Sequence, residues 1–273
     1  MKTAWMEAAR VLKKALVITL NGSPKFRLQA CGNTFWVTYE NRNSRIDRDY
    51  PLLQALAQGA SCIFDVGANR GITSLIMAMS LPTSGVIYTF EASEMACHVA
   101  QENIALNGLQ DRVKIINALI TEQTGQVNDF YWNFDSAGAS MVAGFMGEYD
   151  PMRKVSLSLD TFYSQTGIVP DLVKIDVEGS EERVIRGMER LMCEGKPVVE
   201  VELHNWKDLT PERTIANLLP LLERVGYKVI DLRTRQEVRD AGVFKGRDRC
   251  HTLLLPKGHT FPARLKNLDT SNL

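Results

Sequence analysis

Apolar residues gather in short runs along this chain from residue 61 onward, and amphipathic segments separate the runs. Apolar runs bounded by polar residues or glycine predict buried strands, whereas apolar residues spaced three and four apart predict helices. We expect strands at 61–66, 86–91, 113–119, 172–178, 197–204, 226–232 and 250–256, and helices at 71–80, 94–107, 180–193 and 211–225. This alternation predicts an α/β fold with a mostly parallel, seven-stranded sheet. Because a polar loop joins the last two strands, they are expected to form an antiparallel hairpin.

The ends of the chain lie outside this alternation. Residues 4–20 carry an apolar stripe at helical spacing, residues 26–40 predict a hairpin, and residues 50–58 predict a short helix that begins at Pro51. We therefore expect an N-terminal helix and hairpin cap over 1–60, a main domain over 61–258 and a C-terminal tail over 259–273. The helix over 4–20 is expected to pack on the body of the protein. A lid, a homodimer contact or a helix lying on a membrane surface are the alternatives.

A stretch over 121–160 follows neither the strand pattern nor the helix pattern. Its aromatic residues and methionines flank a run of small residues, Ser136-Ala137-Gly138-Ala139-Ser140. Aromatic and apolar side chains are typical of the lining of a substrate cleft, which predicts an insertion on the substrate side. The alternative is an additional sheet element that packs as core.

Composition narrows the class of protein. The chain has 273 residues, of which 45% are hydrophobic and 23% are charged, as in soluble globular proteins. Its 32 lysines and arginines balance 32 aspartates and glutamates, so a nucleic-acid partner is not expected. Five scattered cysteines indicate neither a disulfide framework nor a zinc cluster, and they fit a reducing, cytoplasmic compartment. No apolar run approaches the roughly twenty residues that a membrane span needs.

The segment Ile63-Phe64-Asp65-Val66-Gly67-Ala68-Asn69-Arg70-Gly71 joins the first strand of the expected sheet to a helix. Its glycines tolerate positive φ and allow a ligand to approach the backbone closely. The dinucleotide motif G-x-G-x-x-G is missing, which argues against a nicotinamide-dependent oxidoreductase. About twenty residues later the next strand ends in Glu91, where this kind of fold places the acid that binds ribose hydroxyls. The two features together predict a site for an adenosyl ligand.

Two later strands carry polar residues where a buried parallel strand is normally apolar. The polar residues alternate with apolar ones, so each strand presents them on one face. They are Lys174, Asp176 and Glu178 on the first strand, and Glu200, Glu202 and His204 on the second. Buried charges destabilise a fold unless they are paired, so Lys174 is expected to neutralise Glu200 or Asp176.

The catalytic candidates are the polar residues nearest the strand ends, because open α/β sheets bind ligands at that edge. They are Asp176, Glu178, Glu202 and His204. Histidine, or a carboxylate crowded by other carboxylates, has a pKa suited to removing a hydroxyl proton near neutral pH. A less favoured alternative is a divalent cation held by Asp176 with Glu202, His204 or Asn205, which would lower the pKa of the hydroxyl. A purely structural, hydrogen-bonded His204 is a further alternative.

The strand over 172–178 is part of a longer sequence, Leu172-Val173-Lys174-Ile175-Asp176-Val177-Glu178-Gly179-Ser180-Glu181, which Val184-Ile185-Arg186-Gly187-Met188 follows. This sequence resembles the signature of the FkbM family of methyltransferases. Further matching segments are 64–71, Phe90-Glu91-Ala92, Leu159-Asp160-Thr161-Phe162 and Glu200-x-Glu202-x-His204. The resemblance covers residues 60–232 and implies a class I, Rossmann-like fold. Arg70 is a departure, since the family often has an apolar or small residue there.

The resemblance implies S-adenosylmethionine as the donor and O-methylation of a hydroxyl on a sugar, glycolipid or natural product, hence a small-molecule or glycan partner. It implies the following contacts: Asp65, Gly67, Asn69 and Gly71 around the methionine end and the ribose, Glu91 on the ribose hydroxyls, Ala92, Ser93, Asn117 and Ala118 around the adenine, and Asp176 beside the sulfonium and the acceptor. The alternative is a non-catalytic S-adenosylmethionine-binding protein of the same fold. Asp176, Glu202 and His204 argue against that alternative, because a binding protein has no need of them.

Overall fold

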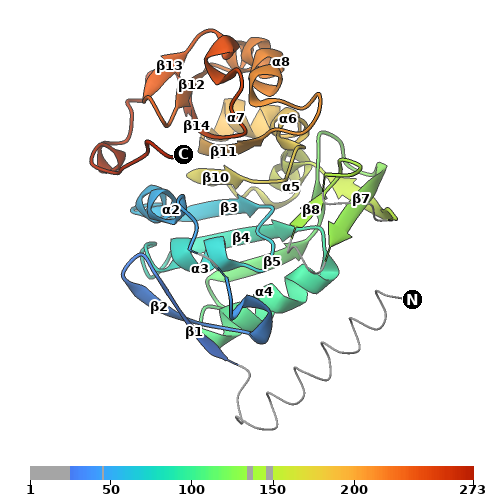
Figure 1. The fold of residues 1–273 in the computed structure, drawn as a ribbon, viewed down its shortest axis with the longest axis vertical. Helices are drawn as coiled ribbons and strands as arrows, with labels where there is room; N and C mark the ends of the chain where they lie inside the picture. The colour runs from blue at the N-terminus through green and yellow to red at the C-terminus, as the bar shows by residue number, and fades with distance from the viewer. Residues whose placement is uncertain (1–24, 45, 134–137, 146–149) are drawn as a thin grey trace.

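The structure is a computed structural model, and it describes residues 25–44, 46–133, 138–145 and 150–273. Among these residues, eight strands form a central sheet in the order β13-β12-β14-β11-β10-β3-β4-β5 (Figure 1). Their bounds are β13 Gln236–Val238, β12 Tyr227–Asp231, β14 Arg249–Pro256, β11 Val198–His204, β10 Leu172–Ile175, β3 Cys62–Val66, β4 Val86–Glu91 and β5 Val113–Asn117. Neighbours from β11 to β5 are parallel, whereas β14 is antiparallel to β11 and β12. The expected α/β fold and its antiparallel C-terminal pair are confirmed, and the short β13 adds an eighth strand.

Helices cover both faces of the sheet. Helices α2 (Tyr50–Ala57), α3 (Ile72–Ala78) and α4 (Glu94–Leu106) contribute to one buried apolar cluster, and α5 (Leu159–Thr166), α6 (Glu181–Arg186), α7 (Glu189–Gly195) and α8 (Pro211–Arg224) contribute to the other. Successive residues of a strand face opposite sides of a sheet. Accordingly, Ile63 of β3 belongs to the first cluster and Phe64 to the second.

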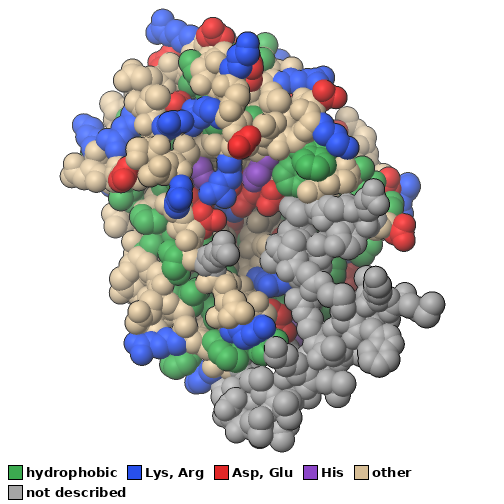
Figure 2. All heavy atoms as spheres, viewed as in Figure 1, with side chains coloured by type: hydrophobic (Ala, Val, Ile, Leu, Met, Phe, Trp, Pro, Cys, Tyr) green, Lys and Arg blue, Asp and Glu red, His purple; other side chains and the backbone are tan. Residues whose placement is uncertain are grey.

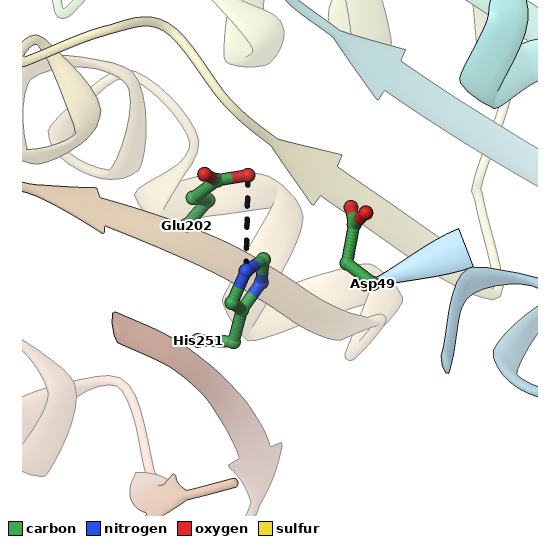
Figure 3. Close-up of side chains that lie close together, drawn as sticks. All are labelled: Asp49, Glu202 and His251. Carbon is green, nitrogen blue, oxygen red and sulfur yellow. Dashed lines mark ion pairs between the residues drawn. The ribbon is translucent and has the colours of Figure 1, made fainter. Parts of the chain in front are cut away.

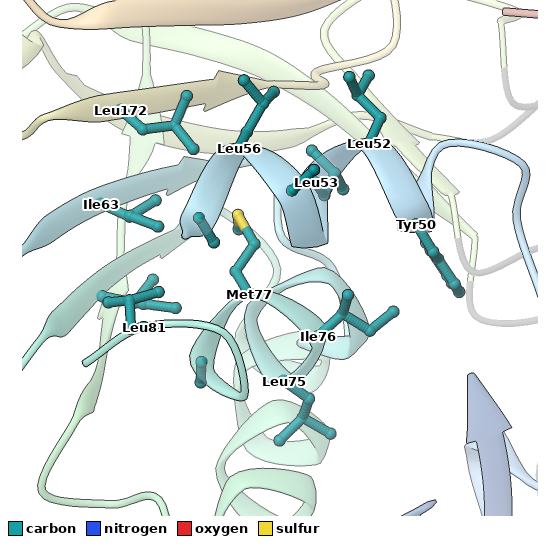
Figure 4. Close-up of a cluster of buried hydrophobic side chains, with 14 of the residues drawn as sticks. Tyr50, Leu52, Leu53, Leu56, Ile63, Leu75, Ile76, Met77, Leu81 and Leu172 are labelled. Atoms are coloured by element: carbon teal, nitrogen blue, oxygen red, sulfur yellow. The ribbon is translucent and has the colours of Figure 1, made fainter. Parts of the chain in front are cut away.

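Helix α2 anchors the N-terminal part of the described chain to the sheet. Its residues Leu52, Leu53 and Leu56 are buried among Ile63 of β3, Leu172 of β10 and the side chains of α3 (Figure 4). Removing such leucines from water stabilises the fold by about 1.5–3 kcal/mol each. This packing holds Asp49, the residue before the helix, in the interior, where 4% of its surface is exposed.

The strands within the 121–160 stretch form a small second sheet together with β6, which lies directly before the stretch. Its order is β6-β9-β7-β8, with bounds β6 Leu119–Ile120, β9 Met152–Leu157, β7 Val127–Asn133 and β8 Gly138–Ser140. Strands β7 and β9 are antiparallel, and β8 continues the sheet beyond β7. The additional sheet element expected as the alternative for this stretch is therefore present.

Two expected elements differ from the structure. Strand β10 ends at Ile175 rather than at 178. The amide of Asp176 makes the last bond to β3, to the carbonyl of Val66 at 3.0 Å, and Glu178 then turns to a φ of +54°. Asp176 and Glu178 thus lie in the loop after the strand. The helix expected over 180–193 is two helices, α6 and α7, separated at Gly187. A Cβ at Gly187 would lie 2.2 Å from the carbonyl oxygen of Thr121. The break between the two helices is therefore in direct backbone contact with the start of the 121–160 insertion.

The N-terminal and C-terminal segments are integrated into this body. The hairpin is confirmed as β1 (Phe26–Ala30) and β2 (Asn33–Val37), and short 3-10 helices in the described part of the chain lie at Tyr39–Asn41, Ala241–Phe244 and Ala263–Leu265. The helix expected over 4–20 lies outside the described residues. Leu265 and Leu273 of the tail are buried. Among the described residues we find no helix with the length and apolar character required to span a bilayer.

Candidate active site

Strand β3 ends at Val66 and leads into a tight turn. Gly67 and Gly71 adopt φ values of +79° and +77°, and Asn69 adopts +51°. A Cβ at Gly67 would lie 1.8 Å from the backbone oxygen of Asp176, so only glycine fits there. This turn and the loop after β10 are therefore in direct backbone contact, which brings the two sequence motifs together.

We expect Gly67→Ala to destabilise the protein by about 2–4 kcal/mol, because overpacking and a left-handed backbone both oppose the side chain. Gly108→Ala is the matched control, since Gly108 has a φ of +68° but nothing lies within 4 Å of a Cβ placed there. The control should lose about 1–2 kcal/mol from backbone strain alone. Urea denaturation measures both variants, and equal losses would contradict the packing argument.

A pocket, termed the donor pocket, opens beside this turn at the carboxyl ends of β3 and β4. The predicted donor-binding residues that line it are Gly67, Asn69, Glu91, Ala92, Ala118 and Asp176. Phe130, Ala139 and Met141 of the 121–160 insertion also line it. The insertion therefore contributes apolar walls to a cavity as well as forming a sheet.

Glu91 lies at the end of β4 with both carboxylate oxygens held in place. The amide of Asn69 donates to Oε2 at 2.8 Å, and the amide of Ser93 donates to Oε1 at 2.7 Å. Burial raises the pKa of Glu91, and these backbone hydrogen bonds oppose the rise. Each carboxylate oxygen has a second lone pair, so the group is able to accept hydrogen bonds from two neighbouring hydroxyls as well.

Ser93 and Asn117, which were predicted to bind the methyl donor, do not line the donor pocket but stabilise the segments that form it. The Ser93 hydroxyl accepts a hydrogen bond from the amide of Ala96 at 3.2 Å and caps α4. The Asn117 side chain donates to the carbonyl oxygens of Glu91 and Ala92 at 2.9 and 3.1 Å. Asn117 thereby ties the end of β5 to the end of β4 instead of lining the pocket.

Asp65 is fully buried beneath the turn. The hydroxyls of Thr73 and Ser74 donate to its Oδ2 at 2.8 and 2.6 Å. These bonds fasten α3 to β3, so Asp65 shapes the turn from inside and does not line the donor pocket.

Lys174 neutralises the carboxylates at the ends of β3 and β10. Its Nζ lies 3.2 Å from Oδ2 of Asp176 and 3.7 Å from Oδ1 of Asp65. Burial opposes its charge, but these carboxylates outweigh burial and raise the pKa of Lys174 above its usual value. The expected pairing with Asp176 is confirmed. Glu200, the other expected partner, instead binds Nδ1 of His251 at 2.8 Å.

Four carboxylates surround the His204 imidazole. Nδ1 lies 2.8 Å from Glu181, and Nε2 lies 3.2 Å from Glu178, 3.5 Å from Glu202 and 3.7 Å from Asp176. Burial lowers the pKa of a histidine, but hydrogen bonds to Glu181 and Glu202 outweigh it and raise the pKa of His204 to about 11. A protonated ring accepts no further proton, so both ring nitrogens donate to the carboxylates around them.

A second cavity, termed the polar cleft, lies on the other side of the Gly67 turn. Its charged lining includes Asp47, Asp49, Asp176, Glu178, Glu202 and Arg249. Figure 2 shows histidine, acidic and basic side chains gathered at a hollow in this face of the molecule. The residues that line both the polar cleft and the donor pocket are Gly67, Asn69, Asp176 and Glu178. The two cavities therefore meet at the loop after β10.

A sequence profile described as the Methyltransferase FkbM domain matches residues 65–229. This match covers more than half of the chain and contains the turn, Glu91, the loop after β10 and His204. The chain belongs to the FkbM methyltransferase family. S-adenosylmethionine is the methyl donor of this family, and the donor pocket offers the acid and the close-approach glycine that the donor requires.

Curated relatives of this FkbM-family chain match less than half of its length. The ribosomal protein L11 methyltransferase of Caldanaerobacter subterraneus subsp. tengcongensis is 28% identical over 130 residues, 48% of this chain and 39% of the relative. The tRNA1(Val) (adenine(37)-N6)-methyltransferase of Bacteroides thetaiotaomicron is 33% identical over 85 residues, 30% of this chain and 35% of the relative. The chain spans well under half the length of these relatives.

Solved structures with a similar fold include two methyltransferases. Methyltransferase FkbM from Methylobacillus flagellatus KT is 15% identical with a TM-score of 0.44, covering 79% of this chain and 47% of that chain. The O-methyltransferase from Bacillus cereus in complex with SAH is 16% identical with a TM-score of 0.47, covering 78% of this chain and 83% of that chain.

Sequence reasoning missed three residues that shape the site of this FkbM methyltransferase. Glu181 holds Nδ1 of His204, Arg249 lies 2.9 Å from Glu202, and Ser140 donates to the carbonyl of Glu178 at 2.6 Å. Glu181 belongs to the segment that resembles the FkbM signature, but the sequence offered no reason to assign it a role. The sequence did not indicate the partners of Arg249 and Ser140, because those partners lie tens of residues away along the chain.

Proposed function

We propose that this FkbM-family protein is an S-adenosylmethionine-dependent O-methyltransferase that acts, in the cytoplasm, on a hydroxyl of a sugar, glycolipid or natural product. The observation that carries the proposal is the junction of two cavities at Asp176 and Glu178. The donor pocket has the features that suit an adenosyl group, and the polar cleft opens on the other side of the same loop. An acceptor in the cleft would meet the donor at that loop.

The polar cleft suits a hydroxylated acceptor. Carboxylates accept hydrogen bonds from hydroxyls, and Arg249, Asn41 and Ser44 in the same lining supply donors. Acidic side chains outnumber lysine and arginine in this lining, which disfavours a polyanion such as nucleic acid. The charge of the cleft therefore supports a neutral, polyhydroxylated molecule.

Glu178 is the residue that we propose as the general base. It lies at the junction of the cavities, and burial together with the Asp176 carboxylate raises its pKa to about 7. A base with such a pKa accepts a hydroxyl proton near neutral pH. The donor, when bound, supplies a methyl group on a sulfonium sulfur, which keeps the electron pair of the broken carbon–sulfur bond. The acceptor oxygen gains the methyl group and gives its proton to Glu178, while the His204 ring, 3.2 Å from Oε2 of Glu178, fixes the position of that carboxylate.

The direct test combines donor binding with methyl transfer. Calorimetry with S-adenosylmethionine should show one binding site, and a methyl-labelled donor should label hydroxylated glycans or natural products in a panel. Absence of donor binding would contradict the donor assignment. Transfer to tRNA or ribosomal protein, without transfer to any hydroxylated small molecule, would contradict the acceptor class. Donor binding without any transfer would support the non-catalytic alternative.

We expect Glu91→Gln to weaken S-adenosylmethionine binding by about 10- to 100-fold, because a hydrogen bond to a charged group is worth about 1.5–3 kcal/mol. Glutamine also brings an N–H group toward backbone amides that require an acceptor. Glu94→Gln is the control, since Glu94 is 80% exposed at the start of α4 and lines neither cavity. Titration calorimetry compares the two, and equal affinities would contradict the ribose-binding role.

A further inference from the structure

Asp49, Glu202 and His251 converge beneath the floor of the polar cleft, at a place that neither motif predicted (Figure 3). Asp49 precedes α2, Glu202 belongs to β11 and His251 belongs to β14. Each offers one oxygen or nitrogen atom, and these three atoms lie within 4.8 Å of one another. The exposed fractions of the residues are 4%, 4% and 1%, so the group is shielded from bulk water.

Two of these atoms are buried without a hydrogen-bond partner among the described residues. They are Nε2 of His251 and Oδ1 of Asp49. Nε2 of His251 lies 3.9 Å from Oε2 of Glu202, which is too long for a direct hydrogen bond. Buried polar side-chain atoms in native proteins are nearly always satisfied, so the two atoms indicate a species that lies between them.

The surroundings orient the three groups as ligands. Glu200 Oε1 lies 2.8 Å from Nδ1 of His251, so a neutral ring keeps its proton on Nδ1 and offers the lone pair of Nε2 to an ion. A carboxylate behind a metal-binding histidine is the usual arrangement of such sites. Arg249 holds the other oxygen of Glu202, Oε1, at 2.9 Å, so Oε2 is the atom that turns toward His251.

Charge also favours a cation at this place. Asp49, Glu200 and Glu202 are buried carboxylates, and Arg249 neutralises one of them. Burial opposes a charge on His251, but without an ion Glu200, Glu202 and Asp49 outweigh burial, raise the pKa of His251 to about 9 and hold a proton on its ring. A divalent cation that displaced this proton would balance the two carboxylates that Arg249 leaves, and unbalanced charge in a protein interior is strongly destabilising.

We propose that Asp49, Glu202 and His251 bind one divalent transition-metal ion, for which Mn²⁺ and Zn²⁺ are the probes. One imidazole nitrogen and two carboxylate oxygens form a ligand set that both ions accept. Bonds of about 2.0–2.2 Å place two ligands of one ion at most about 4.4 Å apart, so the 3.9 Å separation of His251 and Glu202 fits, and a small side-chain movement brings Asp49 into range.

The ion would join the N-terminal segment to the C-terminal strands. It would tie the start of α2 to β11 and β14 and fix Glu202, which lies 3.5 Å from His204 in the polar cleft. Asp49 and Glu202 line the cleft, which gives the ion a route from solvent. The test of this site is separate from the test of the donor site, because none of the three residues lines the donor pocket.

Mn²⁺ binding to the chelator-treated full chain tests the proposal. Mn²⁺ is the better first probe, because it prefers oxygen and nitrogen ligands and the five free cysteines would also capture Zn²⁺. Calorimetry should show one Mn²⁺ per chain, and Mn²⁺ should raise the melting temperature. Absence of both effects at millimolar Mn²⁺ would overturn the proposal.

Variants identify the ligands. Asp49→Asn keeps the size of the side chain and should weaken Mn²⁺ binding at least tenfold, and His251→Gln should do the same. His98→Gln is the matched control, since His98 is an exposed histidine 3.6 Å from Glu102, and it should leave Mn²⁺ affinity unchanged. Donor affinity, measured separately, verifies that each variant is folded. Wild-type Mn²⁺ affinity in folded Asp49→Asn protein would overturn the assignment.

Discussion

Replacing Glu178 by glutamine should lower kcat by about 100- to 10,000-fold, the range that a general base contributes. Glutamine has the size of glutamate but accepts no proton from the acceptor hydroxyl. Since Glu178 lies at the junction of the two cavities, the loss should appear in kcat, while the dissociation constant for S-adenosylmethionine changes little. Steady-state kinetics with the labelled acceptor, together with donor calorimetry, measures both quantities.

The pH profile separates a base from a merely structural residue. The pKa of Glu178 is raised to about 7, and its ionised form is the active one. Wild-type kcat/KM should therefore rise with pH until about 7 and then level off, and Glu178→Gln should lose this limb. Glu182→Gln is the control, because Glu182 binds Arg186 at 2.9 Å and lines neither cavity. If Glu178→Gln retained more than a tenth of wild-type kcat, Glu178 would not be the base.

The sequence predicted the positions of the strands well because apolar runs report burial directly. Ile87 and Phe90 of β4, for example, face opposite sides of the sheet and both are fully buried, as a buried parallel strand requires. The end of β10 was harder to predict. Alternation in 172–178 indicated a continuous strand, yet Glu178 and Gly179 have φ values of +54° and +98°. The backbone bends there because Gly67 touches Asp176, and no local pattern reveals a contact across 109 positions.

The sequence predicted which residues form the candidate site, but it did not predict their charge states. Asp176, Glu178, Glu202 and His204 do lie together, as the meeting of strand ends at one sheet edge requires. The charge of His204 depends on Glu181, whose importance follows only from its position 2.8 Å away in space. His251 did leave a signal, since it is a titratable residue in the buried part of β14. Its partner Asp49 left none, because an acid before a helix is ordinary capping chemistry.

The other large effect should come from Lys174, the cation on which the polar face of the sheet depends. Lys174→Met should destabilise the protein by about 3–5 kcal/mol, because removing one partner of a buried pair leaves an uncompensated charge. The side chains of Lys174 and Asp65 are 1% and 0% exposed, and Asp65 Oδ1 has no hydrogen-bond partner among the described residues. For a chain of this size the melting temperature should fall by about 2–4 °C per kcal/mol.

Two comparisons test this explanation against a simple packing defect. Lys154→Met removes a lysine that lies 2.9 Å from the exposed Glu94, and it should change stability by less than about 1 kcal/mol. The Lys174→Met deficit should also shrink as pH falls from 7.5 toward 5.5. An unpaired buried carboxylate has a folded-state pKa above its unfolded value, so its protonation favours the folded state, and the stability it restores is lost again as pH rises. A pH-independent deficit would show that lost packing, rather than the stranded charge of Asp65 and Asp176, accounts for the loss.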